Sequence, residues 1–127
     1  MRWVLHGKLT SAVAAALVRH GHRVLPANDL AIAEPAAGND APAQEFLRAA
    51  QTKQLDVVTA DVGLVHAIFE EKIRFNRVVV FLQLEGDEVE QDDAVDRLFE
   101  RYNRLSPGRL YTVTGSRVKI RQLPGAH

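Results

Sequence analysis

Short apolar runs alternate with segments whose apolar residues recur every three or four positions, and this alternation constrains the fold most. The short runs predict buried strands, and the longer period predicts amphipathic helices. The resulting order is β-α-β-α-β-α-β-α-β-β, which is typical of a mostly parallel sheet. Strands are expected at 3–5, 23–25, 56–59, 77–84, 110–114 and 118–123. Helices are expected from a cap at Thr10 or Ser11 to Gly21, from 42 to about 53, from a cap at Asp61 through 69, and from about 90 to 105.

We therefore expect an α/β fold, a three-layer sandwich with a mostly parallel central sheet, formed by a single domain over residues 1–127. The last two predicted strands flank Gly115 and Ser116, which is a hairpin signal. This hairpin is expected to extend one edge of the sheet in the antiparallel direction.

Composition excludes several classes of function. The 127 residues contain no cysteine, which rules out disulfide scaffolds, thiolate metal sites and cysteine nucleophiles. Sixteen basic residues balance sixteen acidic ones, so a globally basic nucleic-acid binder is not expected. The longest apolar stretches, 12–18 and 78–82, fall well short of the roughly 20 residues that span a bilayer. We interpret the chain as a cytoplasmic protein with no membrane segment.

Polar residues follow the predicted strands at the positions where open α/β sheets bind ligands, outside the carboxyl ends of the strands. Carboxylates gathered there, without cysteine, indicate a hard divalent cation such as Mg²⁺ or Mn²⁺. Such an ion suits phosphodiester hydrolysis, because it activates water and neutralises the phosphate. The candidates are His6, Asp29, Asp61 and Glu85 after the strands, with Asp40 and Glu45 near the start of the helix at 42.

In the order and spacing of its segments the chain resembles a PIN-like domain, of the compact type found in the toxins of VapBC-like toxin–antitoxin modules. The resemblance covers nearly the whole chain, and it implies a metal-dependent ribonuclease that serves as the toxin of such a pair. The matching stretches are 3–9 with the helix to Gly21, 21–24 through 29–30, 45–47, 57–61, and 108–110 through 118–124.

The chain also departs from the family pattern at its acidic positions. The resemblance places an aspartate, often followed by glutamate, where His6 and Gly7 stand. The family pattern has an acid near position 43, where this chain has Ala43. It often has a further acid two residues after the Thr-x-Asp motif, where this chain has Gly63. The motif itself is intact at 59–61. Replacing a carboxylate with a neutral imidazole weakens a Mg²⁺ site and shifts its preference toward Mn²⁺.

Two functions follow from these matches and departures. In the first, the protein is a metal-dependent ribonuclease with Asp61, Glu45 and His6 as catalytic residues and Mg²⁺ or Mn²⁺ held by Asp61, Asp40, Glu45 and Asp29. In the second, it is a non-catalytic PIN-like module that binds RNA or a protein partner. Each acid also has an ordinary structural interpretation: Asp61 as a helix cap, Glu45 as an acid in a helix first turn, and Asp29 as a turn residue.

Basic residues concentrate toward the C-terminus. Arg97, Arg101 and Arg104 fall at i, i+4 and i+7 of the last predicted helix and would form a ridge that contacts RNA phosphates. Matching to the helix dipole explains the same residues without RNA.

His20 and His22, on either side of Gly21, are expected at the surface. As partners the resemblance implies RNA and an antitoxin-like protein, and the terminal hairpin could pair two chains into a homodimer.

Overall fold

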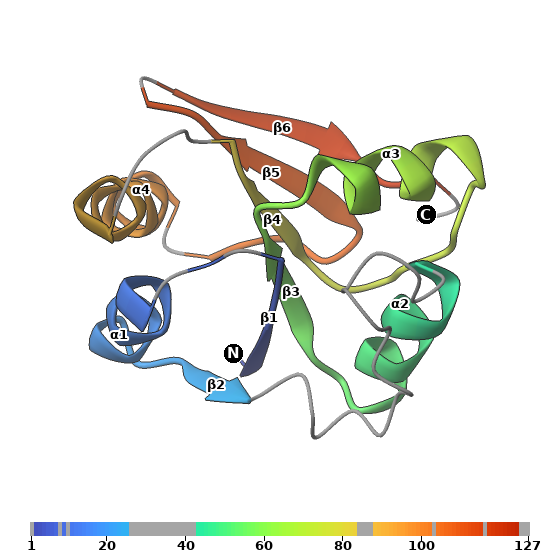
Figure 1. Ribbon diagram of the computed structural model, residues 1–127, viewed down its shortest axis with the longest axis horizontal. Coiled ribbons are helices and arrows are strands. Elements are labelled where there is room, and N and C mark those ends of the chain that lie inside the picture. Colours follow the sequence, from blue (N-terminus) through green and yellow to red (C-terminus); the bar gives the residue numbers. More distant parts are fainter. Residues whose placement is uncertain are drawn as a thin grey trace.

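The protein is described from a computed structural model, which places residues 2–7, 9, 11–25, 43–83, 88–102, 104–115 and 117–124. Six strands form one sheet in the order β2-β1-β3-β4-β5-β6 (Figure 1). Neighbouring strands are parallel except β5 and β6, which pair in the antiparallel direction. The predicted α/β fold with a mostly parallel sheet is confirmed. The strands are β1 (Arg2–His6), β2 (Arg23–Leu25), β3 (Asp56–Thr59), β4 (Val79–Leu82), β5 (Arg109–Val113) and β6 (Val118–Gln122).

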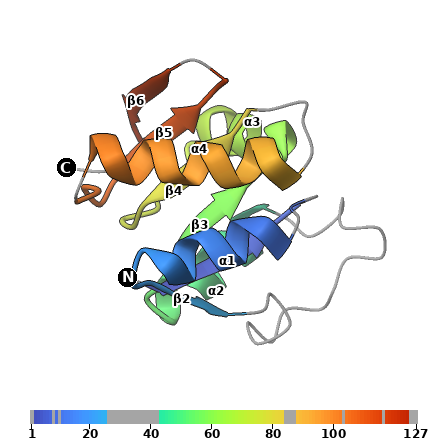
Figure 2. The same cartoon turned by 90° about the vertical axis from the view of Figure 1, so that its left-hand side faces the viewer.

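Two helices cover each face of the sheet. One cluster of buried side chains joins the sheet to α2 (Ala43–Thr52) and α3 (Val62–Glu70). A second cluster joins the opposite face to α1 (Ser11–Arg19) and α4 (Glu88–Arg101), which lie side by side (Figure 2). Within the described chain, none of the helices is both long and apolar enough to cross a bilayer.

The central strands explain why the sheet needs cover on both sides. All four residues of β3 and all four of β4 are buried. Side chains alternate between the faces of a strand, so Val57 packs under α2 and α3 while Val58 packs under α1 and α4. Continuous apolar runs of this kind are the sequence signature of strands buried on both faces.

The last helix is where the predicted boundaries differ most. The apolar stripe of Leu98, Tyr102 and Leu105 predicts a helix over 90–105, but α4 ends at Arg101. Leu105 still enters the core, from the segment after the helix. That segment is held by a 2.8 Å hydrogen bond from the Ser106 N–H to the Tyr111 hydroxyl.

Candidate functional site

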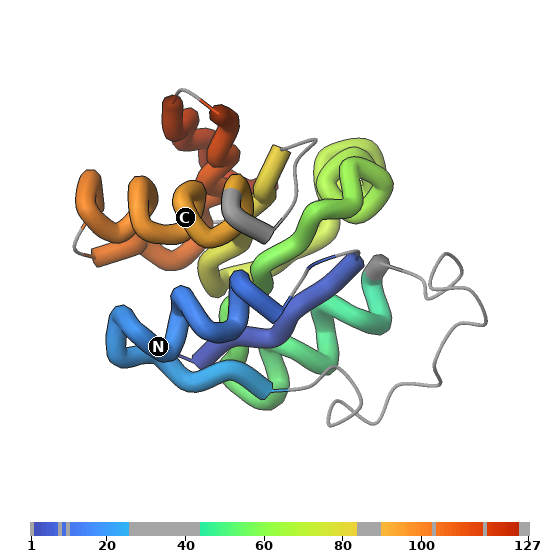
Figure 3. The backbone as a smooth tube through the Cα atoms, turned by 60° about the vertical axis from the view of Figure 1, so that its left-hand side comes forward, coloured from blue at the N-terminus to red at the C-terminus, as the bar shows by residue number. Residues whose placement is uncertain are grey.

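The carboxyl ends of β1 and β3 lie side by side. Two predicted site residues, His6 and Asp61, meet there with a third polar residue, Thr59. His6 is the register partner of Thr59, and the Ala60 N–H donates to the His6 carbonyl oxygen at 3.3 Å. Asp61 follows at the start of α3. We call His6, Thr59 and Asp61 the carboxyl-edge site. In Figure 3 the end of β1 also lies beside the start of α2, so four elements meet at this edge.

His6 is a half-buried imidazole with two defined contacts. Its Nδ1 shares a hydrogen bond of 2.9 Å with the Thr59 hydroxyl. Its ring packs on that of Phe46 in the first turn of α2, with centroids 4.7 Å apart. Burial lowers the pKa of His6 below its ordinary value, and the negative charge of Asp61 opposes this shift only in part. The lowered pKa favours the neutral imidazole, and within the described part of the chain its Nε2 is left for another ligand.

Asp61 is the N-cap of α3, as predicted. Its Oδ1 accepts the Gly63 N–H at 2.9 Å, and its own N–H donates to the Thr59 hydroxyl at 2.9 Å. A cap of this kind contributes about 1 kcal/mol to stability. The Thr59 hydroxyl thus connects the backbone of Asp61 with the ring of His6, which fixes both ends of the site.

Gly7 and Gly63 lie close to Asp61, at positions where the PIN-like pattern has acids. Gly7 has a φ of +81°, and a Cβ there would lie 3.2 Å from Asp61 Cβ and 3.3 Å from Asp61 N. A Cβ on Gly63 would lie 3.1 Å from Asp61 Oδ1. An L side chain at position 7 would be strained by its φ value and crowded by Asp61 as well. Position 7 is thus shaped for glycine, whereas a side chain at position 63 would require the Asp61 carboxylate to shift slightly.

Among the described residues, Glu45 is the only other predicted acid, and it forms no metal-binding group with His6 and Asp61. Glu45 lies in the first turn of α2, and its side chain is exposed. Its neighbour Phe46 makes the contact with His6. Asp29, Asp40 and Glu85 lie outside the described residues, so their predicted roles stay predictions.

The donors at the carboxyl edge fit a divalent cation only in part. Among the described residues, no three histidine, aspartate or glutamate side chains come together as a metal-binding group. With Asp61 Oδ1 and His6 Nδ1 engaged, the site offers Asp61 Oδ2 and His6 Nε2. Mg²⁺ prefers six oxygen ligands and accepts several of them as water, whereas Mn²⁺ also tolerates an imidazole. One carboxylate and one imidazole could hold Mn²⁺ weakly and suit Mg²⁺ poorly.

The predicted arginine ridge is not continuous. Arg97 donates from Nη1 to the Thr114 carbonyl oxygen at 2.7 Å, which ties α4 to the β5–β6 hairpin. Arg101 is exposed at the end of α4. Arg104 is exposed but lies beyond the helix, so the spacing i, i+4, i+7 does not apply to it. Two exposed arginines, rather than a helical row of three, face solvent near this end of α4.

Of the two histidines beside Gly21, His20 is exposed as predicted, whereas His22 is half-buried. His22 Nδ1 accepts a hydrogen bond of 3.2 Å from the indole N–H of Trp3, and its ring lies 4.7 Å from that of Phe99. His20 Nε2 contacts Asp96 at 2.8 Å, which joins α1 to α4. Burial lowers the pKa of His22, and the contact with His20 lowers the pKa of Asp96. His22 therefore packs between Trp3 of β1 and Phe99 of α4.

The lowered pKa values of His6 and His22 predict an acid-sensitive fold. A histidine whose pKa is lower in the folded state binds its proton more readily in the unfolded chain, where the pKa is about 6.5. Its contribution to stability is present above that value and is lost as the pH falls through 6.5 toward the folded-state pKa. We expect the urea midpoint to fall between pH 7.5 and pH 5. The double variant His6→Gln/His22→Gln should show a flatter dependence, and an equally steep one would contradict the assignment.

Thr59 and Phe46 belong to this region although neither is predicted as a site residue. In the sequence, Thr59 stands out only as part of the Thr-x-Asp motif, and its bond to His6 depends on the register of β1 against β3. The spacing of Phe46 predicts a core residue, and it is one, being 4% exposed. Its position against His6 follows from how α2 packs. The pairing of β1 with β3 reveals the first contact, and the packing of α2 reveals the second.

Comparison of the chain with protein-family models, with curated proteins and with solved structures finds no match. Proposals about function therefore rest on the residues, on their geometry and on the resemblance of the sequence to PIN-like domains.

Proposed function

We propose that this chain is a PIN-like domain whose ribonuclease site has lost most of its metal ligands, and that it binds RNA without cleaving it. The observation that carries the proposal is the carboxyl-edge site. Counting only the residues that the structure describes, it holds one carboxylate, Asp61, with His6 at the position of the first acid and with Gly7 and Gly63 close to Asp61. The mostly parallel sheet with two helices on each face is compatible with a three-layer PIN-like fold. A cytoplasmic location is part of this proposal.

Binding of RNA would use the exposed arginines at the end of α4. Arg101 and Arg104 are exposed, and Arg109 is exposed at the start of β5. Tyr111 holds these segments together, because its ring contacts Tyr102 and its hydroxyl accepts the Ser106 N–H. Cations gathered in this way bind phosphates through charge and the release of counterions, without reading sequence.

A metal-dependent ribonuclease is the second candidate, and the retained Asp61 beside a neutral His6 favours it. Asp61 Oδ2 and His6 Nε2 would hold the ion, with further ligands from Asp29, Asp40 or water. When bound, the ion would supply an activated water and neutralise the scissile phosphate. A toxin–antitoxin role with an antitoxin-like partner rests on the family resemblance alone.

Binding and cleavage of a labelled single-stranded RNA in Mn²⁺ and in Mg²⁺ separate the two candidates. The non-catalytic candidate predicts that the wild type binds the RNA and cleaves it no faster than the Asp61→Asn variant does. Cleavage by the wild type that Asp61→Asn abolishes would overturn it in favour of the second. His6→Asp adds a carboxylate at the edge of the sheet, and we expect it to bind Mg²⁺ more tightly than the wild type does.

The arginines give a further test of the first candidate. The double variant Arg101→Glu/Arg104→Glu should weaken RNA binding and reduce the salt slope by about 0.7 for each phosphate that the protein no longer neutralises. Arg48→Glu is the matched control, because Arg48 is an exposed arginine on α2, across the sheet from α4. If the wild type binds no RNA, or if the two variants behave alike, binding by these arginines is excluded.

A further inference from the structure

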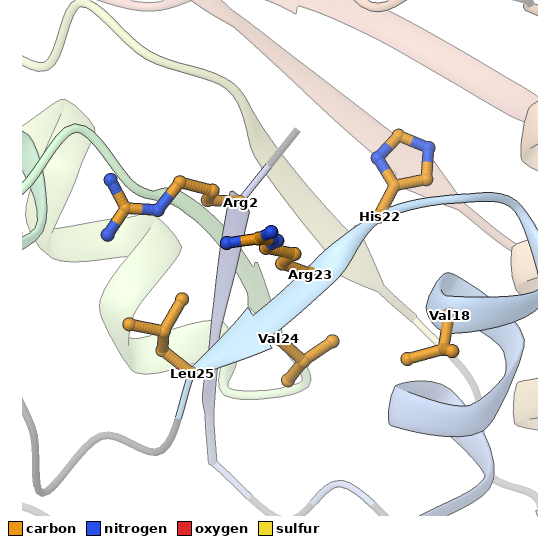
Figure 4. A pocket seen from close by; sticks show the side chains of 6 residues that line it. All are labelled: Arg2, Val18, His22, Arg23, Val24 and Leu25. Atoms are coloured by element: carbon orange, nitrogen blue, oxygen red, sulfur yellow. The ribbon is translucent and has the colours of Figure 1, made fainter.

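The sheet ends at β2, and an open pocket of about 580 Å³ runs along this strand (Figure 4). Among the described residues, no other strand pairs with the outer edge of β2. An unpaired edge presents backbone N–H and C=O groups that can accept another strand. The pocket is lined by Arg2, Val18, His22, Arg23, Val24 and Leu25.

The two sides of this edge differ in chemistry. Leu25 packs with the cluster under α2 and α3, whereas Val24 packs with the cluster under α1 and α4. Side chains alternate along a strand, so Arg23 lies on the same side as Leu25, and its register partner Arg2 lies there too. Figure 4 shows Arg2, Arg23 and Leu25 on one side of β2 and His22, Val24 and Val18 on the other.

The first side carries unbalanced positive charge. Arg2 and Arg23 are Cα partners on neighbouring strands, and both are exposed. Like charges directly opposite each other on a sheet are destabilising. Within the described chain, the ion pairs involve Arg19, His20 and Arg77 and leave these two arginines without an acid. An acidic group bound here would relieve the repulsion.

Apart from His22, the second side is apolar and open to solvent. Val18 on α1 is 60% exposed, the most exposed large apolar residue of the described chain. Val24 beside it is half-buried. A ligand side chain placed against these two valines would be an apolar one, because it would remove their exposed surface from water.

We propose that the outer edge of β2 binds an extended segment of a partner protein as an added strand, in which acidic and apolar residues alternate. In an added strand, successive side chains point to opposite faces of the sheet. The acidic set would meet Arg2 and Arg23, and the apolar set would meet Val18 and Val24. The backbone of β2 supplies the hydrogen bonds, and the two sides supply the specificity.

A second copy of this chain fits the edge less well. Pairing of two β2 edges would bring Arg2 and Arg23 of both chains together, and like charges repel. The opposite edge of the sheet has the same property, since β6 exposes Lys119 and Arg121. We expect these charges to oppose self-association at both edges, and the predicted homodimer through the hairpin stays a prediction.

Fluorescence anisotropy with labelled peptides tests the proposal directly. The probe is a peptide of about eight residues that alternates glutamate and valine, within the usual length of a strand. The controls are a peptide with the same composition in two blocks and a peptide that alternates lysine and valine. We expect the alternating acidic peptide to bind about tenfold more tightly than either control. Equal binding of the block peptide would overturn the proposal, because charge alone would then explain the affinity.

Charge reversal provides the matching test on the protein. Arg2→Glu/Arg23→Glu should weaken binding of the acidic peptide and create binding of the lysine peptide, whereas Arg117→Glu, an exposed arginine before β6, should change neither. Val18→Asp, at an exposed position of α1, should weaken binding without loss of folding. Unchanged binding in Val18→Asp would overturn the proposal even if the double variant does not fold.

The outcome is distinguishable from that of the proposed RNA binding. The double variant Arg2→Glu/Arg23→Glu should bind RNA as the wild type does, because its substitutions lie on β1 and β2 rather than near the end of α4. Loss of RNA binding in this variant would assign the two arginines to RNA and overturn the peptide proposal. Failure of RNA binding in the wild type would leave the peptide result unaffected.

Discussion

Replacing Trp3 with alanine should destabilise the protein by about 3–5 kcal/mol, the usual range for deleting a fully buried large aromatic side chain. Trp3 is 0% exposed, and its ring packs edge-on against Phe99 of α4. Its indole N–H donates to His22. The variant loses the packing and leaves the His22 acceptor without its partner.

Unfolding in urea is monitored by circular dichroism. Tryptophan fluorescence cannot be used, because Trp3 is the chain's single tryptophan and the variant lacks it. Trp3→Phe is the control, because it keeps an aromatic ring and removes the indole N–H. We expect it to cost about 1–2 kcal/mol, the loss of one hydrogen bond and part of the packing. A cost below about 1 kcal/mol for Trp3→Ala would show that the two helices close over the site without it.

Replacing Asp56 with alanine is expected to cost about 2–4 kcal/mol, because the substitution leaves a buried donor without an acceptor. Asp56 is 1% exposed at the start of β3. Its Oδ1 accepts the Val78 N–H at 2.9 Å, and its Oδ2 lies 3.3 Å from Arg77 Nη2. Val78 is itself buried, so its N–H has no water to replace the carboxylate. The side chain of Asp56 thus holds the entry to β4 against β3.

Asp56→Asn separates the two interactions, since the amide oxygen can still accept the Val78 N–H. We expect Asn to retain about half of the stability that Ala loses. Arg77 is partly exposed, so Arg77→Ala should cost less than Asp56→Ala. If Asn proves as costly as Ala, the ion pair rather than the backbone hydrogen bond carries the effect.

The order of strands and helices could be predicted because each buried run has its own periodicity. The pairing of strands could not, since the sequence contains no local signal that sets β1 between β2 and β3. The contact of His6 with Thr59 depends on that pairing, which joins residues 53 positions apart. The carboxyl edge is therefore predictable as a region, and its geometry needs the structure.

Apolar spacing misleads the prediction at the end of α4. Leu105 continues the stripe of Leu98 and Tyr102, yet it reaches the core after the helix has ended. The spacing of apolar residues predicts which residues are buried, but it does not predict the backbone conformation of the segment that buries them. Arg97 illustrates the same limit, because its acceptor is the Thr114 carbonyl on a distant hairpin.

The packing of α1 against α4 has a consequence for the order in which the protein can fold during synthesis. The ribosome makes the N-terminal part first, but the apolar face of α1 is completed by Val95, Leu98 and Phe99, from the last third of the chain. Until those residues leave the ribosome, Val13 and Leu17 have no helix beside them. A nascent chain that stalls before α4 would keep this face open to chaperones and proteases, so native packing of α1 has to wait for the synthesis of α4.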